Sequence, residues 1–231
     1  MAGNEDQKRQ AAEAAVELLR SGMVVGLGHG STVKFALAAL AAKLKSGELD
    51  KITGVACSKQ TEGEALRLGI PLTELSKGVH IDVTIDGADE VDPQLNLIKG
   101  GGGGLLREKI VAQASAREII AVDESKLSER LGTKHALPIE VSQFGWMLQL
   151  DYIQELGGKA ALRQGTDGQP ALTDQVNYLL DADFGPIADY EGLARMLEAR
   201  SGILEHGLFL DLATDVIVAG VSGLRHLKAN R

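Results

Sequence analysis

The chain has 231 residues, of which 44% are hydrophobic, and its formal charge is -8 at pH 7. This composition excludes a disordered or fibrous protein and supplies enough apolar side chains for one large domain or two unequal ones. The acidic balance also argues against sequence-independent binding of nucleic acid, which depends on clustered Lys and Arg.

No targeting or membrane-spanning pattern is present in the sequence. The first fifteen residues, MAGNEDQKRQAAEAA, contain no apolar stretch. The longest apolar run, residues 35–42, is much shorter than the roughly 20 residues that cross a bilayer. We therefore expect a soluble cytoplasmic protein that has neither a membrane nor a nucleic acid as its partner.

The first 130 residues alternate helical patterns with short apolar strands, which is typical of a parallel α/β sheet. A first helix has Ala12, Val16 and Leu19 on one face, and Ser31 or Thr32 can cap the alanine-rich helix that follows. The predicted strands cover residues 23–25, 52–56, 81–85, 95–98 and 118–122. The alanine-rich helix ends near residue 44, and two later helices cover residues 61–68 and 105–114.

The pattern changes after about residue 133. Strand, helix, strand, strand, helix and strand follow in turn, at residues 137–141, 145–156, 159–163, 175–183, 189–200 and 203–208. This order is that of a ferredoxin-like α+β domain, and the apolar residues 215–220 then form a strand that rejoins the first sheet.

The sequence therefore predicts two domains. The larger one is a Rossmann-like, mostly parallel sheet with helices on both faces, formed by residues 1–132 and 208–231. The smaller one is an inserted ferredoxin-like domain at residues 133–207, which can act as a lid or an interface.

The single cysteine, Cys57, has no partner for a disulfide, and we interpret it as a small buried residue at a strand end. The histidines are scattered without metal-ligand spacing or acidic partners, so neither a zinc site nor a Ser-His-Asp triad is predicted; they are His29, His80, His135, His206 and His226.

Residues 26–32, between a predicted strand and a helix, read GLGHGST. Glycines let the backbone approach a phosphate, and the start of a helix offers free N–H groups. A tight turn needs glycines for steric reasons as well, so this motif alone leaves both interpretations open. A dinucleotide site is disfavoured, because the spacing is G-x-G-x-G and no acidic residue ends the next strand.

Residues 86–90, directly after another predicted strand, read DGADE. Three carboxylates on such a loop can bind sugar hydroxyls, hold a divalent metal or cap a turn. We rank hydroxyl binding above a metal, because oxygen-only metal sites usually draw ligands from several segments.

Lys99 is followed by five consecutive glycines and then by a helix that carries Glu108 in its first turn. The glycines alone would suit a flexible linker, and Glu108 alone could be a helix-start charge or part of a solvated face. Lys126 follows the strand 118–122 and so lies at the same edge of the sheet, where ligands of open parallel sheets bind.

The A-type ribose 5-phosphate isomerases carry ordered motifs that this chain resembles at GLGHGST, IDGADEVD, LIKGGGGGLLREKIVA and VDESKLSERLG. The likeness continues through LPIEV, NYLLDADFGPI and EHGLFL, and so covers nearly the whole chain. The resemblance implies that ribose 5-phosphate and ribulose 5-phosphate are interconverted through an enediol, in the pentose phosphate pathway, without a metal or an organic cofactor. It also implies a homodimer or a homotetramer.

The resemblance further assigns residues to the site. Its catalytic group falls on Glu108 as the base, with Asp86 and Lys99 suggested for ring opening. Its substrate-binding positions fall on His29, Gly30, Ser31, Thr32, Asp86, Gly87, Ala88, Asp89, Lys99, Gly100, Gly101, Gly102 and Lys126. His29 departs from the family pattern, in which threonine is usual, so this position has no hydroxyl to contact a phosphate.

These residue types suit the implied reaction, because a sheltered carboxylate can move a carbon-bound proton and N–H groups or a lysine can stabilise the oxyanion. Related folds also host amino-sugar phosphate deaminases, CoA transferases with a glutamate nucleophile and sugar-phosphate-binding regulatory modules. A CoA transferase would form a covalent thioester on Glu108, and a regulatory module would bind the sugar without turnover.

Overall fold

The structure is a computed structural model and describes residues 2–229. It contains two compact units. The first takes the described residues of 1–88, 107–126 and 211–231, and the second takes residues 89–106 and 127–210. None of the helices in the described part of the chain is long and apolar enough to cross a membrane.

The boundaries of these units differ from the predicted domain boundaries. Residues 89–106, 127–132 and 208–210 group with the second unit, although the prediction gave these three segments to the first domain. The cause is a small antiparallel sheet in which β5 (Leu97–Ile98) pairs with β4 (Glu90–Val91) and β11 (Leu208–Phe209). Strands of two residues show no periodic pattern, so the sequence gives no sign of this pairing.

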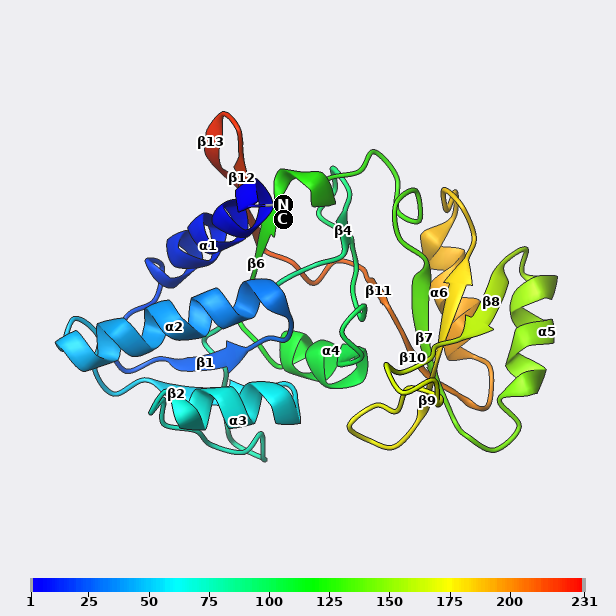
Figure 1. Ribbon diagram of the computed structural model, residues 1–231, viewed down its shortest axis with the longest axis horizontal. Coiled ribbons are helices and arrows are strands. Elements are labelled where there is room, and N and C mark those ends of the chain that lie inside the picture. Colours follow the sequence, from blue (N-terminus) through cyan, green and yellow to red (C-terminus); the bar gives the residue numbers. More distant parts are fainter. Residues whose placement is uncertain (1, 230–231) are drawn as a thin grey trace. The chain divides into compact units, whose positions relative to one another are not determined.

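The first unit is built on a six-stranded sheet with the order β13-β12-β6-β3-β1-β2. All neighbouring strands are parallel except β12 and β13, which form an antiparallel hairpin (Figure 1). The strands are β1 (Val24–Leu27), β2 (Thr53–Ala56), β3 (Val83–Asp86), β6 (Glu118–Asp123), β12 (Asp215–Gly220) and β13 (Gly223–Lys228). The mostly parallel sheet and the return of residues 215–220 to it are confirmed.

Helices pack on both faces of this sheet, as predicted. The apolar residues of α1 (Ala2–Val16) and α2 (Ser31–Ser46) share one buried cluster with Val25 and Leu27 of β1. Side chains alternate along a strand, so Gly26 faces the opposite side of the sheet from Val25 and Leu27. A Cβ atom on Gly26 would meet Thr84 of β3 and Val111 of the helix α4 (Leu105–Gln113), which covers that side. The helix α3 (Lys59–Arg67) follows β2.

The second unit has the predicted ferredoxin-like order of elements. Its four-stranded antiparallel sheet has the order β10-β7-β9-β8, with one cluster of buried apolar residues. The elements are β7 (Leu137–Val141), α5 (Met147–Glu155), β8 (Lys159–Leu162), β9 (Tyr178–Asp183), α6 (Tyr190–Glu198) and β10 (Ile203–His206).

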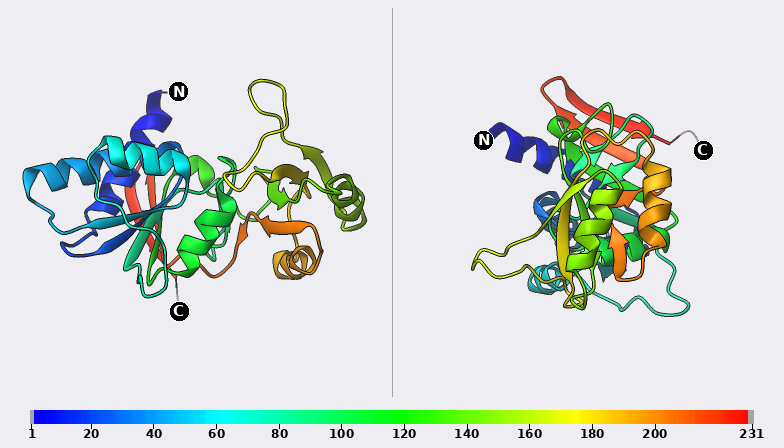
Figure 2. Two further views of the ribbon diagram at one scale, coloured as in Figure 1. Left: turned by 90° about the horizontal axis from the view of Figure 1, so that it is seen from below. Right: turned by 90° about the vertical axis from the view of Figure 1, so that its right-hand side faces the viewer.

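A long loop joins β8 to β9 and extends from the second unit in both views of Figure 2. Its tip contains a turn at residues 165–168, closed by a hydrogen bond of 3.1 Å from the N–H of Gly168 to the carbonyl of Gly165. The start of the loop is tied to β9, because the N–H of Arg163 donates to the carbonyl of Leu179 at 2.8 Å.

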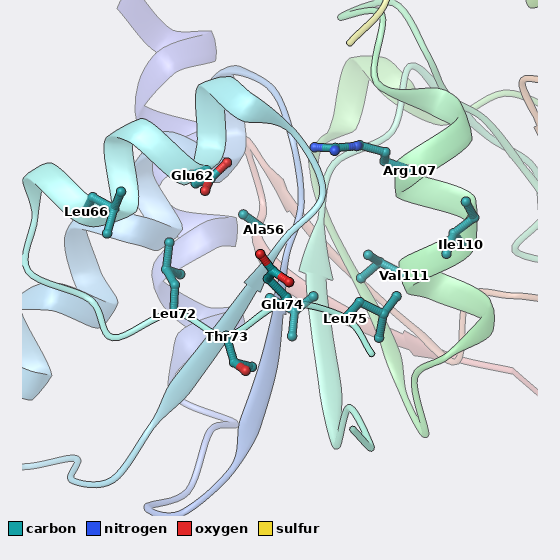
Figure 3. A pocket seen from close by; sticks show the side chains of 11 residues that line it. Ala56, Glu62, Leu66, Leu72, Thr73, Glu74, Leu75, Arg107, Ile110 and Val111 are labelled. Atoms are coloured by element: carbon teal, nitrogen blue, oxygen red, sulfur yellow. The ribbon is translucent and has the colours of Figure 1, made fainter. Parts of the chain in front are cut away.

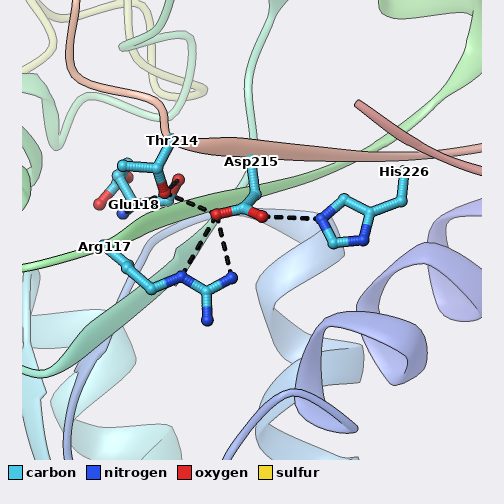
Figure 4. Close-up of polar contacts among 5 residues, drawn as sticks. All are labelled: Arg117, Glu118, Thr214, Asp215 and His226. Atoms are coloured by element: carbon cyan, nitrogen blue, oxygen red, sulfur yellow. Dashed lines mark hydrogen bonds and ion pairs between the residues drawn. The ribbon is translucent and has the colours of Figure 1, made fainter. Parts of the chain in front are cut away.

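A polar network holds the C-terminal hairpin of the first unit around Asp215 (Figure 4). One carboxylate oxygen of Asp215 accepts from Arg117 Nη2 at 3.0 Å and from Thr214 Oγ1 at 2.7 Å, and the other lies 2.7 Å from Nε2 of His226. Burial raises the pKa of this carboxyl, but the hydrogen bonds from Thr214, His226 and Arg117 outweigh burial, so the net shift of the pKa is downward.

We expect the stability that Asp215 contributes to depend on pH. Because its pKa is depressed in the folded protein, this contribution is present above the unfolded pKa of about 3.9 and is lost as pH falls through the folded pKa. At pH 7, Asp215→Asn should lower the free energy of unfolding by about 1–3 kcal/mol. Urea titrations of both proteins should show this difference shrinking below pH 4; a constant difference down to pH 2 would contradict the assignment.

Candidate active site

The glycine-rich turn between β1 and α2 lies against the end of β3. Gly30 stands at the N-cap of α2 with a φ of 111°, a conformation that glycine adopts without strain. The backbone N–H of His29 donates to Oδ1 of Asp86 at 3.0 Å. A Cβ atom on Gly28 would lie 2.6 Å from the Cβ of Asp86 and still closer to its carboxylate. The conformation of this turn therefore requires the hydrogen bond to Asp86 and a glycine at position 28.

His29 is held by a chain of hydroxyl groups that the sequence did not indicate. Nδ1 of His29 lies 2.9 Å from Oγ of Ser58, which contacts Oγ1 of Thr61, and that hydroxyl donates to the carbonyl of Gly28 at 2.7 Å. Ser58 also caps α3 by accepting from the N–H of Thr61. A serine directly before a helix is a capping signal, but it does not reveal the contact with His29.

We expect the imidazole of His29 to be dispensable for turnover. The change His29→Thr removes its contact with Ser58, but it keeps the backbone N–H that donates to Asp86 and the N–H groups at the start of α2. The value of kcat/KM should stay within about tenfold of the wild type, which corresponds to about 1.4 kcal/mol. Steady-state kinetics with ribose 5-phosphate, the substrate that the resemblance implies, test this. A complete loss of turnover in the folded variant would give the imidazole an essential role.

The acidic loop after β3 is divided between the two units. Asp86 is 1% exposed, and its Oδ1 also accepts from the N–H of Gly87 at 2.7 Å. Asp89 and Glu90 belong to the second unit. Glu90 accepts hydrogen bonds from the backbone N–H groups of residues 132–135, so this carboxylate caps a turn. Of the three acidic side chains in the loop, Asp86 and Asp89 therefore suit a substrate better.

Glu108 lies beside Asp86 in the first unit, on the first turn of α4. One carboxylate oxygen of each and Sγ of Cys57 lie within 4.8 Å of one another, and all three residues are buried. Among the described residues, this is the only group whose ligand atoms are close enough for a metal ion. The same closeness suits a proton-transfer site, because a carboxylate sheltered from bulk water can take a proton from a bound substrate.

The glycine run forms an ordered turn in the second unit. Lys99 is 2% exposed, its N–H donates to the carbonyl of Gly207 at 2.9 Å, and its Nζ lies 5.4 Å from the ring centre of Phe209. The N–H of Gly103 closes a turn onto the carbonyl of Gly100 at 3.0 Å, and the N–H of Gly101 donates to Asp89 at 2.7 Å. These contacts do not fit the alternative of a flexible linker.

Two lysines of the first unit supply positive charge. Lys126 ends the short 3₁₀ helix η1 (Glu124–Lys126) that follows β6, which neighbours β3 in the sheet. Nζ of Lys8, on α1, donates to Oγ of Ser31 at 3.3 Å. Lys8 was missed in the sequence because a lysine on a surface helix carries no pattern that would distinguish it from its neighbours.

A separate groove of about 560 Å³ lies in the first unit beside β2, α3 and α4 (Figure 3). Its lining contains none of the predicted site residues; the polar part includes Glu62, Glu74 and Arg107, and the rest is largely apolar, with Leu66, Leu75 and Ile110. Two carboxylates near one arginine suit an anionic ligand poorly, so the buried group at Asp86 and Glu108 is the better candidate site.

Comparisons with known proteins agree on one family. The family model of ribose 5-phosphate isomerase A (phosphoriboisomerase A) matches residues 53–223. The ribose-5-phosphate isomerase A of Chloroflexus aurantiacus is 55% identical over 96% of this chain and 93% of its own length. That of Desulfatibacillum aliphaticivorans is 53% identical over 99% of this chain and the whole of its own.

Solved structures give the same result. A D-ribose-5-phosphate isomerase in complex with phospho-erythronic acid has a TM-score of 0.95 and 39% identity, covering 97% of this chain and 99% of its own. The ribose 5-phosphate isomerase of Plasmodium falciparum has a TM-score of 0.95 and 37% identity, covering 98% of this chain and all of its own.

Proposed function

Because this chain belongs to the ribose 5-phosphate isomerase A family, we propose that it is an aldose–ketose isomerase that interconverts D-ribose 5-phosphate and D-ribulose 5-phosphate through an enediol. The observation that carries the proposal is the buried pair of carboxylates, Asp86 and Glu108, within 4.8 Å of each other at the end of β3 and the start of α4.

Glu108 acts as the base in this proposal. Its carboxylate takes the proton from C2 of the open-chain aldose; the electron pair of that C–H bond forms the C1=C2 double bond, and the carbonyl π electrons move onto O1 to give an enediolate. The hydroxyl proton then passes from O2 to O1, and the carboxyl group returns its proton to C1 to yield the ketose, so one carboxylate serves both half-reactions. The burial of Glu108, at 4% exposure, excludes the bulk water that would otherwise solvate the carboxylate.

The remaining groups bind the sugar and stabilise charge. Asp86 and Lys99 assist opening of the cyclic sugar, and Lys99 with the amides of Gly100, Gly101 and Gly102 stabilises the developing oxyanion. Gly87, Ala88 and Asp89 bind sugar hydroxyls. The structure of a relative contains phospho-erythronic acid. This compound is a phosphorylated sugar acid, and its carboxylate can mimic an enediolate. The same compound should inhibit this enzyme competitively.

The phosphate of the substrate is bound by the start of α2. The N–H groups of Gly30, Ser31 and Thr32 lie at the positive end of a helix of 16 residues, which favours an anion. Lys8, hydrogen-bonded to Ser31, and Lys126 add positive charge. We further propose that the protein acts in the cytoplasm as a homodimer or homotetramer; sedimentation velocity tests the assembly.

Conversion of ribose 5-phosphate in deuterated water, with EDTA present, tests the proposed function. Proton transfer through an enediol exposes the migrating hydrogen to solvent, so part of the ribulose 5-phosphate should carry deuterium at C1, which NMR detects. No label in either sugar after prolonged incubation at equilibrium, over many turnovers, would contradict the enediol route. Loss of turnover in EDTA and its return with Zn²⁺ would instead make Cys57, Asp86 and Glu108 metal ligands and contradict the metal-free mechanism.

A further inference from the structure

Arg163 lies at the end of β8 in the second unit, where the sheet fixes its backbone. Its N–H donates to the carbonyl of Leu179 at 2.8 Å, and its carbonyl accepts from the N–H of Ala171 at 2.9 Å. Its side chain is 17% exposed. A long side chain that leaves a fixed backbone in this way can hold a neighbouring segment in place.

The guanidinium of Arg163 is oriented by Asp181 on β9. Nε donates to one carboxylate oxygen of Asp181 at 2.9 Å, and Nη2 donates to the other. This two-point contact fixes the plane of the guanidinium group and keeps it charged. One nitrogen, Nη1, is left to donate elsewhere.

That nitrogen reaches the glycine run. Nη1 of Arg163 donates to the carbonyl of Gly100 at 2.9 Å and to the carbonyl of Gly101 at 3.1 Å. The N–H of Gly101 donates to Asp89 on the opposite side of the same residue. Glycine peptides rotate more easily than any others, so without these contacts the amides of this segment would take many orientations.

We propose that Arg163, oriented by Asp181, is a positioning residue that fixes the lysine–glycine loop, residues 99–102, in its substrate-binding conformation. Arg163 touches no reacting atom in this role. It acts by directing the amides after Lys99, and it deepens the proposed function, on which its effect on activity rests. Lysine can replace it only in part, because one ammonium group cannot hold a carboxylate at two points and two carbonyls in the same plane.

The test compares Arg163→Ala and Arg163→Lys with Arg200→Ala. Arg200 is a matched control in the same unit: it is half-buried, it donates to Gln149 at 3.2 Å and its guanidinium lies 4.6 Å from the ring centre of Tyr152, and none of these groups belongs to the loop. The measurements are hydrogen exchange of the amides in residues 99–104, kcat and KM for ribose 5-phosphate, and Tm.

In Arg163→Ala, exchange of the loop amides should accelerate at least tenfold, KM should rise about tenfold and kcat should fall about tenfold. Arg163→Lys should give intermediate exchange rates, KM and kcat, and Arg200→Ala should match the wild type in these three quantities. A merely structural role would lower the active fraction, and thus apparent kcat, but leave KM unchanged.

Wild-type KM and wild-type exchange in a folded Arg163→Ala protein would overturn the proposal. If the wild type itself does not isomerise ribose 5-phosphate, the proposed function fails, whereas the exchange experiment still decides whether Arg163 orders the loop. If Arg163→Ala does not fold, Arg163→Lys provides the same comparison with the charge retained.

Discussion

Replacing Glu108 with Gln should lower kcat by about 10²–10⁴-fold while the substrate still binds, because an amide cannot accept the proton from C2. Gln has nearly the shape of Glu, so the buried position on α4 should stay filled. Steady-state kinetics give kcat and KM, and washout of deuterium from substrate labelled at C2 reports proton abstraction directly.

The matched control is Glu62→Gln. Glu62 is an exposed acidic residue in the first turn of α3, so this variant removes the same charge from the same place on another helix of the first unit. It should keep wild-type kcat, because interaction with a helix dipole alone does not move a proton. Near wild-type kcat in Glu108→Gln would show that Glu108 is a helix-start charge and that the base must be sought elsewhere.

Replacing Gly28 with Ala should lower kcat/KM by about 100-fold or more, because the added methyl group displaces the carboxylate of Asp86 and a 1 Å displacement can have this effect. The Cβ would lie 2.6 Å from the Cβ of Asp86, a separation that packed atoms do not adopt. Either Asp86 or the turn must move, and either movement breaks the hydrogen bond from the N–H of His29 to Asp86.

The same substitution should lower the free energy of unfolding by about 1–3 kcal/mol, as other overpacked sites do. Gly63→Ala is the control, since this glycine lies within α3 and no atom stands within 4 Å of its added Cβ. It should leave activity unchanged and not lower Tm. If Gly28→Ala kept wild-type kcat/KM, the position of Asp86 would not matter for turnover, and its assignment to the site would have to be withdrawn.

Periodic patterns made much of the fold predictable. Continuous apolar strands alternating with helices indicated the parallel sheet, and the change of order after residue 133 indicated the ferredoxin-like unit. A strand was predicted at residues 95–98, but the small sheet of β4, β5 and β11 was not predictable. Strands of two residues show no period, and β5 pairs with β11 about 110 residues further along the chain.

The candidate site was predictable as far as its residues follow strand ends or glycine runs. Asp86 and Glu108 could be named in this way, and their carboxylates do lie close together. Cys57, Ser58 and Arg163 were beyond such reasoning as site neighbours, because each reaches its partners only through the tertiary fold. Glu90 shows the opposite case, since the sequence grouped it with the site and the structure uses it to cap a turn.

The two edges of the six-stranded sheet differ in how they discourage unwanted association. At β2, the backbone of Gly54 is already engaged, because it exchanges hydrogen bonds with Pro71 and Thr73. At the other edge, β13 is almost wholly exposed and carries Arg225 and Lys228. Positive charge on an open strand repels a second copy of that strand, so charge protects the β13 edge from edge-to-edge aggregation. The β2 edge is protected because its backbone groups at Gly54 are already hydrogen-bonded within the chain.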